Sequence, residues 1–65
     1  VQVLENTSIK VINVYNLLGN CILSLIPESN SQKVEVDLSV APTGVLLVEV
    51  RLNDGRKKTI KVLKQ

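Results

Sequence analysis

The sequence of 65 residues contains no histidine, phenylalanine, tryptophan or methionine, and Tyr15 is its only aromatic residue. Without histidine, the chain cannot form a Ser-His-Asp or Cys-His nucleophile system, an imidazole metal site or the commonest general base. It also lacks a glycine-rich phosphate loop and an acidic calcium loop. Glu35 and Asp37 are the only carboxylates in i,i+2 register, and an exposed strand face explains them without catalysis. We therefore expect a protein that is not an enzyme and that binds no cofactor, metal or small-molecule substrate.

Cysteine and long apolar runs are equally scarce. A single Cys21 cannot form an internal disulfide, and its apolar neighbours predict a buried structural thiol. The longest apolar run, Val45–Val48, is far shorter than the ~20 residues of a membrane-spanning helix. The chain starts without Met and shows no signal peptide, so we expect it to be a piece of a longer protein.

Aliphatic residues that alternate with polar ones dominate what is present. The 11 valines, 10 leucines and 5 isoleucines suit pleated, half-buried surfaces. In Val34–Leu38, apolar and acidic residues alternate strictly, which indicates a strand with one buried face. The adjacent Val11 and Ile12 indicate burial on both faces or a bulge. The same reasoning predicts six strands, at Val1–Leu4, Lys10–Tyr15, Cys21–Ile26, Val34–Leu38, Val45–Leu52 and Lys57–Leu63.

Turn residues separate these strands, and no segment has the periodicity of a helix. Leu17–Asn20 reads as a hairpin turn, Ala41–Gly44 as a type I or II turn, and Asn53–Gly55 as a tight hairpin tip. Six short strands with short turns predict a single all-β domain over residues 1–65, a small antiparallel sandwich of Ig-like or Greek-key style. A seventh strand before Val1 is compatible with the pattern. If it is missing, one sheet edge is open, and we expect homodimerisation or pairing with a neighbouring domain there.

Positive charge is concentrated at the carboxyl end. Residues 51–65 hold six Lys or Arg against Asp54, a net +5, whereas residues 1–50 hold two against five acids, a net −3. Two interpretations remain open: an edge strand kept soluble by its lysines, and a docking surface for an anionic partner. Nucleic acid is the weaker partner, because no aromatic side chains interleave with the basic ones to stack on bases.

Three segments together resemble a known family. Val14–Gly19 resembles the "VYDLLGR" segment, Asp37–Val45 the "DLSxLPAGVY" segment, and Lys57–Gln65 the closing "KKIVKQ" strand of the C-terminal sorting domains of type IX secretion substrates in the Bacteroidetes. Their order and spacing match over roughly residues 8–65. The chain departs from the family pattern at Asn16, Asn20 and Leu46, and it lacks the upstream "YPNP" segment.

The resemblance implies an Ig-like sandwich at the end of an exported protein. It would direct its cargo from the periplasm across the outer membrane by the type IX translocon, after which a surface sortase would cleave it and the cargo would be surface-anchored or released. The protein partners implied are thus translocon and sortase components. Family-motif positions fall on Tyr15, Gly19, Pro42 and Gly44, and we expect the translocon to contact Lys57, Lys58, Lys61, Lys64 and Gln65.

Two other functions fit the same residues. One is an Ig-like accessory or adhesion module at the cell surface, although a glycan-binding face usually needs more than one aromatic ring. The other is a structural spacer, or a truncated domain that dimerises by its open edge. The parent reading frame would separate these, since sorting requires a signal peptide at its start and this segment at its end. The sequence identifies neither the cargo nor the cleavage site.

Overall fold

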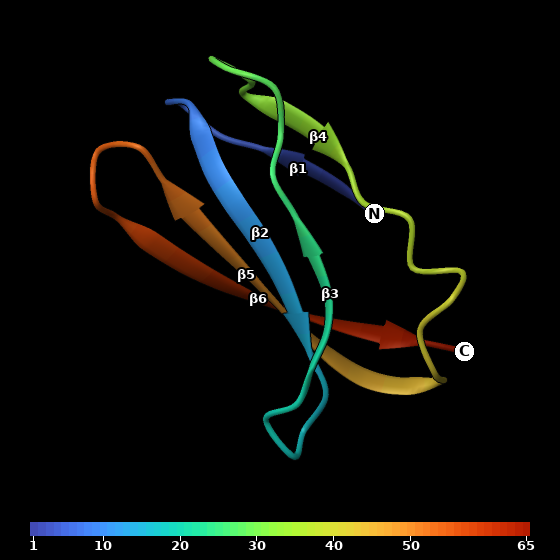
Figure 1. Ribbon diagram of the computed structural model, residues 1–65. Coiled ribbons are helices and arrows are strands. Elements are labelled where there is room, and N and C mark those ends of the chain that lie inside the picture. The colour runs from blue at the N-terminus through green and yellow to red at the C-terminus, as the bar shows by residue number, and fades with distance from the viewer.

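The computed structural model describes all residues, 1–65, and contains six strands and no helix. The strands are β1 (Gln2–Leu4), β2 (Ile9–Tyr15), β3 (Cys21–Leu25), β4 (Lys33–Glu35), β5 (Gly44–Leu52) and β6 (Lys57–Lys64). All strand pairs are antiparallel. One sheet has four strands in the order β3-β2-β5-β6, and the other consists of β1 and β4 (Figure 1). The predicted all-β class with six strands in antiparallel sheets is therefore confirmed.

Two hairpins lie side by side in the four-stranded sheet. The β2–β3 hairpin and the β5–β6 hairpin meet along β2 and β5, and their turns point to opposite ends of the molecule (Figure 1). Between β3 and β5 the chain crosses to the second layer, where it forms β4 and then a segment outside any strand over residues 36–43, which contains a turn at Leu38–Ala41 and is called the extended segment below. As a consequence, β3 and β6 are the edges of the larger sheet.

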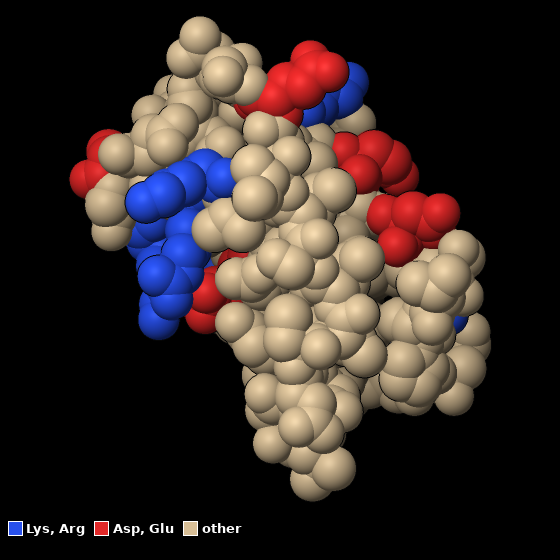
Figure 2. Space-filling model, in the orientation of Figure 1, with Lys and Arg blue, Asp and Glu red and all other residues tan.

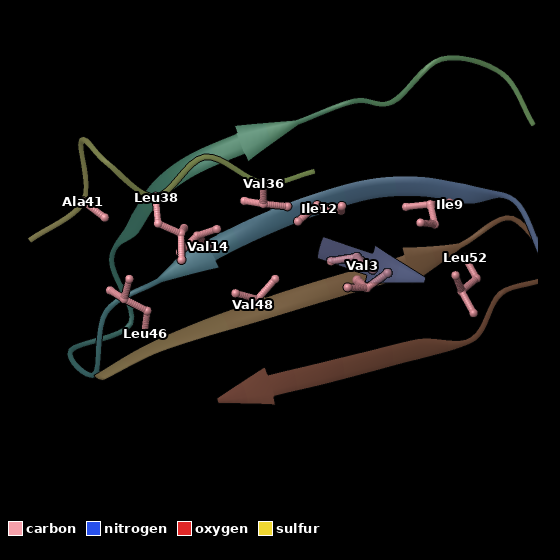
Figure 3. Packing of buried hydrophobic residues seen from close by; sticks show 11 residues of the cluster. Val3, Ile9, Ile12, Val14, Val36, Leu38, Ala41, Leu46, Val48 and Leu52 are labelled. Atoms are coloured by element: carbon pink, nitrogen blue, oxygen red, sulfur yellow. The ribbon is translucent and has the colours of Figure 1, made fainter. Parts of the chain in front are cut away.

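The core lies between this sheet and the layer formed by β1, β4 and the extended segment. The side chains from β2 and β5 meet Val3 of β1 and Val36, Leu38 and Ala41 of the extended segment (Figure 3). Every second residue of β5 is buried, as alternation requires of a strand with one face on the core. The buried cluster consists of Val3, Ile9, Ile12, Val14, Val36, Leu38, Ala41, Leu46, Val48, Val50 and Leu52.

The strand predicted over Val34–Leu38 is shorter than expected. β4 ends at Glu35, which pairs with Gln2, the first residue of β1. Val36 still exchanges hydrogen bonds with Val1, from Val36 N–H to Val1 O at 2.6 Å and from the Val1 amino group to Val36 O at 2.9 Å, and the pairing ends there, but the alternation persists. Val36 and Leu38 stay buried and Asp37 stays exposed, so the hydrophobic pattern reported the burial correctly and the strand length incorrectly.

Two further local predictions can be compared with the structure. The register of β2 against β5 shifts between Ile9 and Val11, which confirms the bulge and leaves Ile12 fully buried. The burial of Cys21 was wrong, because its side chain is exposed. Cys21 pairs with Tyr15 beyond a second register shift, at the start of the edge strand β3, where no layer covers it. Its Sγ donates a hydrogen bond to the carbonyl of Leu23, at 3.5 Å.

Candidate functional site

β6 carries the residues that the sequence proposes as a recognition surface, and its position divides them between two faces. The register places Lys58, Ile60 and Val62 opposite Val50, Val48 and Leu46, which are buried core residues of β5. We call this the inner face of β6; it comprises Lys58, Ile60, Val62 and Lys64. Its outer face comprises Lys57, Thr59, Lys61 and Leu63. The five proposed contact residues therefore do not form one surface.

Lys58 on the inner face binds an acid from the second layer. Its Nζ lies 2.9 Å from Glu5 Oε1, and the Glu5 side chain is only 5% exposed. Glu5 follows β1, so this ion pair joins the edge of the four-stranded sheet to the smaller sheet. A carboxylate so deeply placed needs a compensating cation. Lys58 thus has a structural partner in the second layer, although its side chain remains 52% exposed.

Lys64 holds the segment that precedes β5. Its Nζ donates hydrogen bonds to the carbonyl of Ser39 at 3.1 Å and to the carbonyl of Ala41. These carbonyls belong to the turn closed by the bond from Ala41 N–H to Leu38 O. In Figure 1 the carboxyl end of β6 accordingly lies beside the extended segment. Lys64 therefore closes the core at this end.

The outer face of β6 carries the more available charge. Lys57 Nζ lies 4.0 Å from Glu49 Oε2, the limit of an ion pair, and Lys61 forms no ion pair. Leu63 is 64% exposed, and Gln65 after the strand is exposed as well. In Figure 2, Lys and Arg gather over the β5–β6 side of the molecule, separated from most of the acids by a broad surface without charge. Of the five proposed residues, Lys57, Lys61 and Gln65 are exposed and not bound to the second layer, whereas Lys58 is exposed about as much as Lys57 but is paired with Glu5.

Glu49 of β5 organises the charges beside this face. Its side chain is 15% exposed and accepts a hydrogen bond from Arg51 Nε at 2.8 Å. The bond from Arg51 lowers the pKa of Glu49 below its ordinary value, and the nearby Lys57 acts in the same direction. Across the sheet, Asn13 faces Glu49 and accepts a bond from the Ser24 hydroxyl at 2.7 Å. Glu49 thus forms an ion pair with Arg51 and lies at the limit of an ion pair with Lys57, but it forms no ion pair with Lys61.

The motif positions Tyr15 and Gly19 belong to the β2–β3 turn. Tyr15 ends β2 and is half-buried, and Gly19 has φ +89°, a backbone conformation that favours glycine. Asn16 holds the turn, because its Oδ1 accepts bonds from the N–H groups of Leu18 and Asn20, both at 3.0 Å. An aspartate could accept the same bonds, so the departure at Asn16 preserves the turn.

Pro42 and Gly44 lie between the extended segment and β5. Pro42 is exposed. Gly44 begins β5 with φ +119°, a backbone conformation that favours glycine, although a Cβ at this position would contact no other atom. The hydrogen-bonded turn of this segment is Leu38–Ala41, whereas the predicted turn over Ala41–Gly44 bends at Ala41 and Thr43 without a backbone hydrogen bond between its ends. Leu38 and Ala41 are buried in the core, and Lys64 donates hydrogen bonds to the carbonyls of Ser39 and Ala41. These contacts stabilise the turn at Leu38–Ala41, before Pro42.

Sequence reasoning missed the apolar tip of the β2–β3 hairpin. Leu17 and Leu18 are 68% and 87% exposed, although leucines in a motif were expected only to mark a turn. The sequence contains a signal for this exposure: adjacent side chains of a strand point to opposite faces, so Leu17 and Leu18 cannot both lie on the buried face. Sequence reasoning also missed Glu5. Its partner Lys58 lies on the same face of β6 as Ile60 and Val62, because these residues are spaced two apart along the strand.

The surface offers no pocket and no group of three metal-ligating side chains. No helix is present that could cross a membrane. Comparison with curated proteins and with solved structures gives no match. A sequence model of one family, described as "Secretion system C-terminal sorting domain", matches residues 1–65, the full length of the chain. The chain therefore belongs to the family of type IX secretion C-terminal sorting domains, which are sorting signals and not catalysts.

Proposed function

We propose that this domain directs a cargo protein through the type IX translocon of the outer membrane and that the outer face of β6 is the surface that the translocon reads. Membership of the family over residues 1–65 carries the sorting role, which implies a secreted or cell-surface protein. The support for the surface is positional: Lys61 and Gln65 form no ion pair or side-chain hydrogen bond within the fold, and Lys57 lies only at the limit of an ion pair with Glu49.

The later steps belong to the same proposal. The cargo reaches the translocon from the periplasm, and a sortase at the cell surface then removes the domain, so that the cargo is anchored or released. In this scheme the domain is the substrate of a peptidase. No feature of the surface favours the alternative of an adhesion module.

The proposal is tested with a reporter that carries a signal peptide and ends in residues 1–65, expressed in a host with a type IX system. We expect the reporter at the cell surface, with a mass that lacks the domain. A reporter that stays in the periplasm would contradict the sorting role. Surface display at full mass would contradict the cleavage step alone.

Point variants locate the recognition surface better than a truncation does. Deleting Thr59–Gln65 should trap the reporter in the periplasm. It also removes Val62, which packs on the core, and the hydrogen bonds of Lys64 to Ser39 and Ala41. Lys61→Glu reverses the charge of the unpaired lysine on the outer face and should reduce display severalfold. The matched control is Lys33→Glu, at an exposed lysine of β4. Equal display of the two variants, both folded by circular dichroism, would exclude Lys61 from recognition.

A further inference from the structure

β6 differs from every other sheet edge of this molecule. β1 and β4 have three residues each, and β3 has five, with a register shift at its start and Pro27 shortly after its end. Short length, bulges, proline and charged side chains, lysine above all, are the devices that keep edges from pairing with other chains. β6 has eight residues, contains no proline and pairs with β5 without any register shift, so its lysines are the one such device that it carries. It is therefore the edge with room for another strand, provided that the strand carries acidic residues.

The backbone groups that β6 presents at this edge follow from its register. Leu52 N–H donates to Arg56 O at 2.9 Å, so Leu52 and Arg56 form a hydrogen-bonded pair. Such pairs alternate along an antiparallel ladder. Accordingly, the inner-face residues from Lys58 onward bond to β5, whereas the N–H and C=O groups of the outer-face residues Thr59 and Lys61 point away from the sheet.

The two faces of this edge favour different side chains on a strand that pairs with β6. On the inner face, Ile60 is 38% exposed although Val48 beside it is fully buried, so the second layer stops short of β6. An added strand would cover Ile60 if it placed apolar side chains on this side. On the outer face, Lys57 and Lys61 would lie next to the alternate side chains of that strand, where carboxylates are favoured.

We propose that β6 receives a strand of alternating apolar and acidic residues from a component of the sorting machinery, which pairs with its open backbone edge. This inference rests on the proposed function and names the mode of recognition at the same surface. A second copy of the chain is a poor occupant, because two β6 strands side by side would bring their lysines together. Complementary charge favours an acidic strand instead.

The direct test uses the 65-residue chain and a capped peptide of the length of β6 that alternates valine and glutamate. Added peptide should shift the amide resonances of β6 and slow hydrogen exchange at the N–H groups of Thr59 and Lys61. A valine–lysine peptide and a valine–glutamate peptide methylated at alternate backbone nitrogens are the controls. Binding of the acidic peptide elsewhere, no binding, or equal binding of the methylated peptide would overturn the proposal.

A backbone variant makes the test specific to strand pairing. Thr59→Pro removes one outward N–H without removing a ladder bond to β5, whereas Thr59→Val changes the side chain and keeps the N–H. We expect the peptide to bind Thr59→Pro roughly tenfold more weakly or worse, and Thr59→Val about as well as the original chain. Retained β5–β6 amide shifts establish that Thr59→Pro is folded. If its fold is lost, Lys61 methylated at its backbone nitrogen in a synthetic chain replaces it.

The reporter assay separates failure of this inference from failure of the proposed function. If the reporter with the original domain stays in the periplasm, the sorting role itself is contradicted. If that reporter reaches the surface and the Thr59→Pro reporter does so equally well, the domain sorts its cargo without strand pairing at β6. Loss of display with Thr59→Pro, but not with Thr59→Val, supports pairing.

Discussion

The two faces of β6 carry the same residue type and use it differently. On the inner face, Lys58 binds the nearly buried Glu5, and Lys64 binds the carbonyls of Ser39 and Ala41. On the outer face, Lys57 lies at the limit of an ion pair with Glu49, and Lys61 has no acidic partner. The four lysines of one strand thus divide into two that bind groups of the second layer, Lys58 and Lys64, and two that do not, Lys57 and Lys61.

This difference shows that the charge of a terminal strand cannot be counted as one surface. The net +5 of residues 51–65 suggests a single basic patch, but two of its lysines face the second layer. Which lysines these are follows from the strand period, since Lys58 and Lys64 share the parity of Ile60 and Val62. The substitutions below compare one lysine of each face.

The largest difference is expected between Lys58→Met and Lys57→Met. Lys58→Met leaves the Glu5 carboxylate without its cation, and we expect the free energy of unfolding to fall by about 1–2 kcal/mol, below the value for a fully buried pair because Lys58 is half exposed. Lys57→Met should change it by less than about 0.5 kcal/mol. Urea denaturation of both variants measures the difference.

A double-mutant cycle assigns the effect to the ion pair. If Lys58 acts through Glu5, the loss caused by Lys58→Met should shrink in a chain that also carries Glu5→Gln, with a coupling above about 0.5 kcal/mol. Additive losses would mean that Lys58 stabilises the fold by packing its aliphatic stem.

A smaller effect is expected at the carboxyl end of β6. Lys64→Met removes the bonds to Ser39 O and Ala41 O, and we expect a loss of about 1 kcal/mol, because Lys64 is only partly buried. The same change should speed hydrogen exchange at the Ala41 N–H, which closes the turn to Leu38. Lys61→Met is the matched outer-face variant and should leave both quantities unchanged. Equal exchange in the two variants would show that the core alone holds the turn.

Much of the fold could be predicted from local patterns, because each pattern has a local physical cause. Alternation marks β2, β5 and β6, and the turn residues at Leu17–Asn20 and Asn53–Gly55 mark their ends. The extended segment after β4 was harder, since the length of a strand depends on its partner. There the burial of Val36 and Leu38 was predictable, and the end of the backbone pairing at the Val1–Val36 bonds was not.

The candidate site was predictable as a strand, and the strand period divides its lysines between two faces, but the partners of the inner lysines were not predictable. The partners of Lys58 and Lys64 lie far away in the sequence, in the segments after β1 and after β4. No local pattern predicts such contacts, because they depend on how the second layer is placed. Cys21 illustrates the same limit, since its apolar neighbours suggest burial and only its position on an edge strand exposes it.

The smallest expected effect concerns which outer-face groups interact with Glu49. The hydrogen bond from Arg51 holds the pKa of Glu49 below its ordinary value. Glu49 therefore adds stability that is complete above the ordinary carboxyl pKa and is lost as the pH falls through the lowered value. Arg51→Met should move the pKa of Glu49 upward, and Lys57→Met should do so by less, as carboxyl NMR titration would measure.

Lys61→Met should leave that titration unchanged, because Lys61 forms no ion pair with Glu49. This result would place Lys61 outside the charge network of the sheet, with its ammonium group available to an incoming acidic strand. If Lys61→Met instead raised the pKa of Glu49 as much as Arg51→Met does, Lys61 would already be neutralised within the domain. The outer face would then have no unpaired lysine, and the charge complementarity that favours an acidic strand at β6 would be lost.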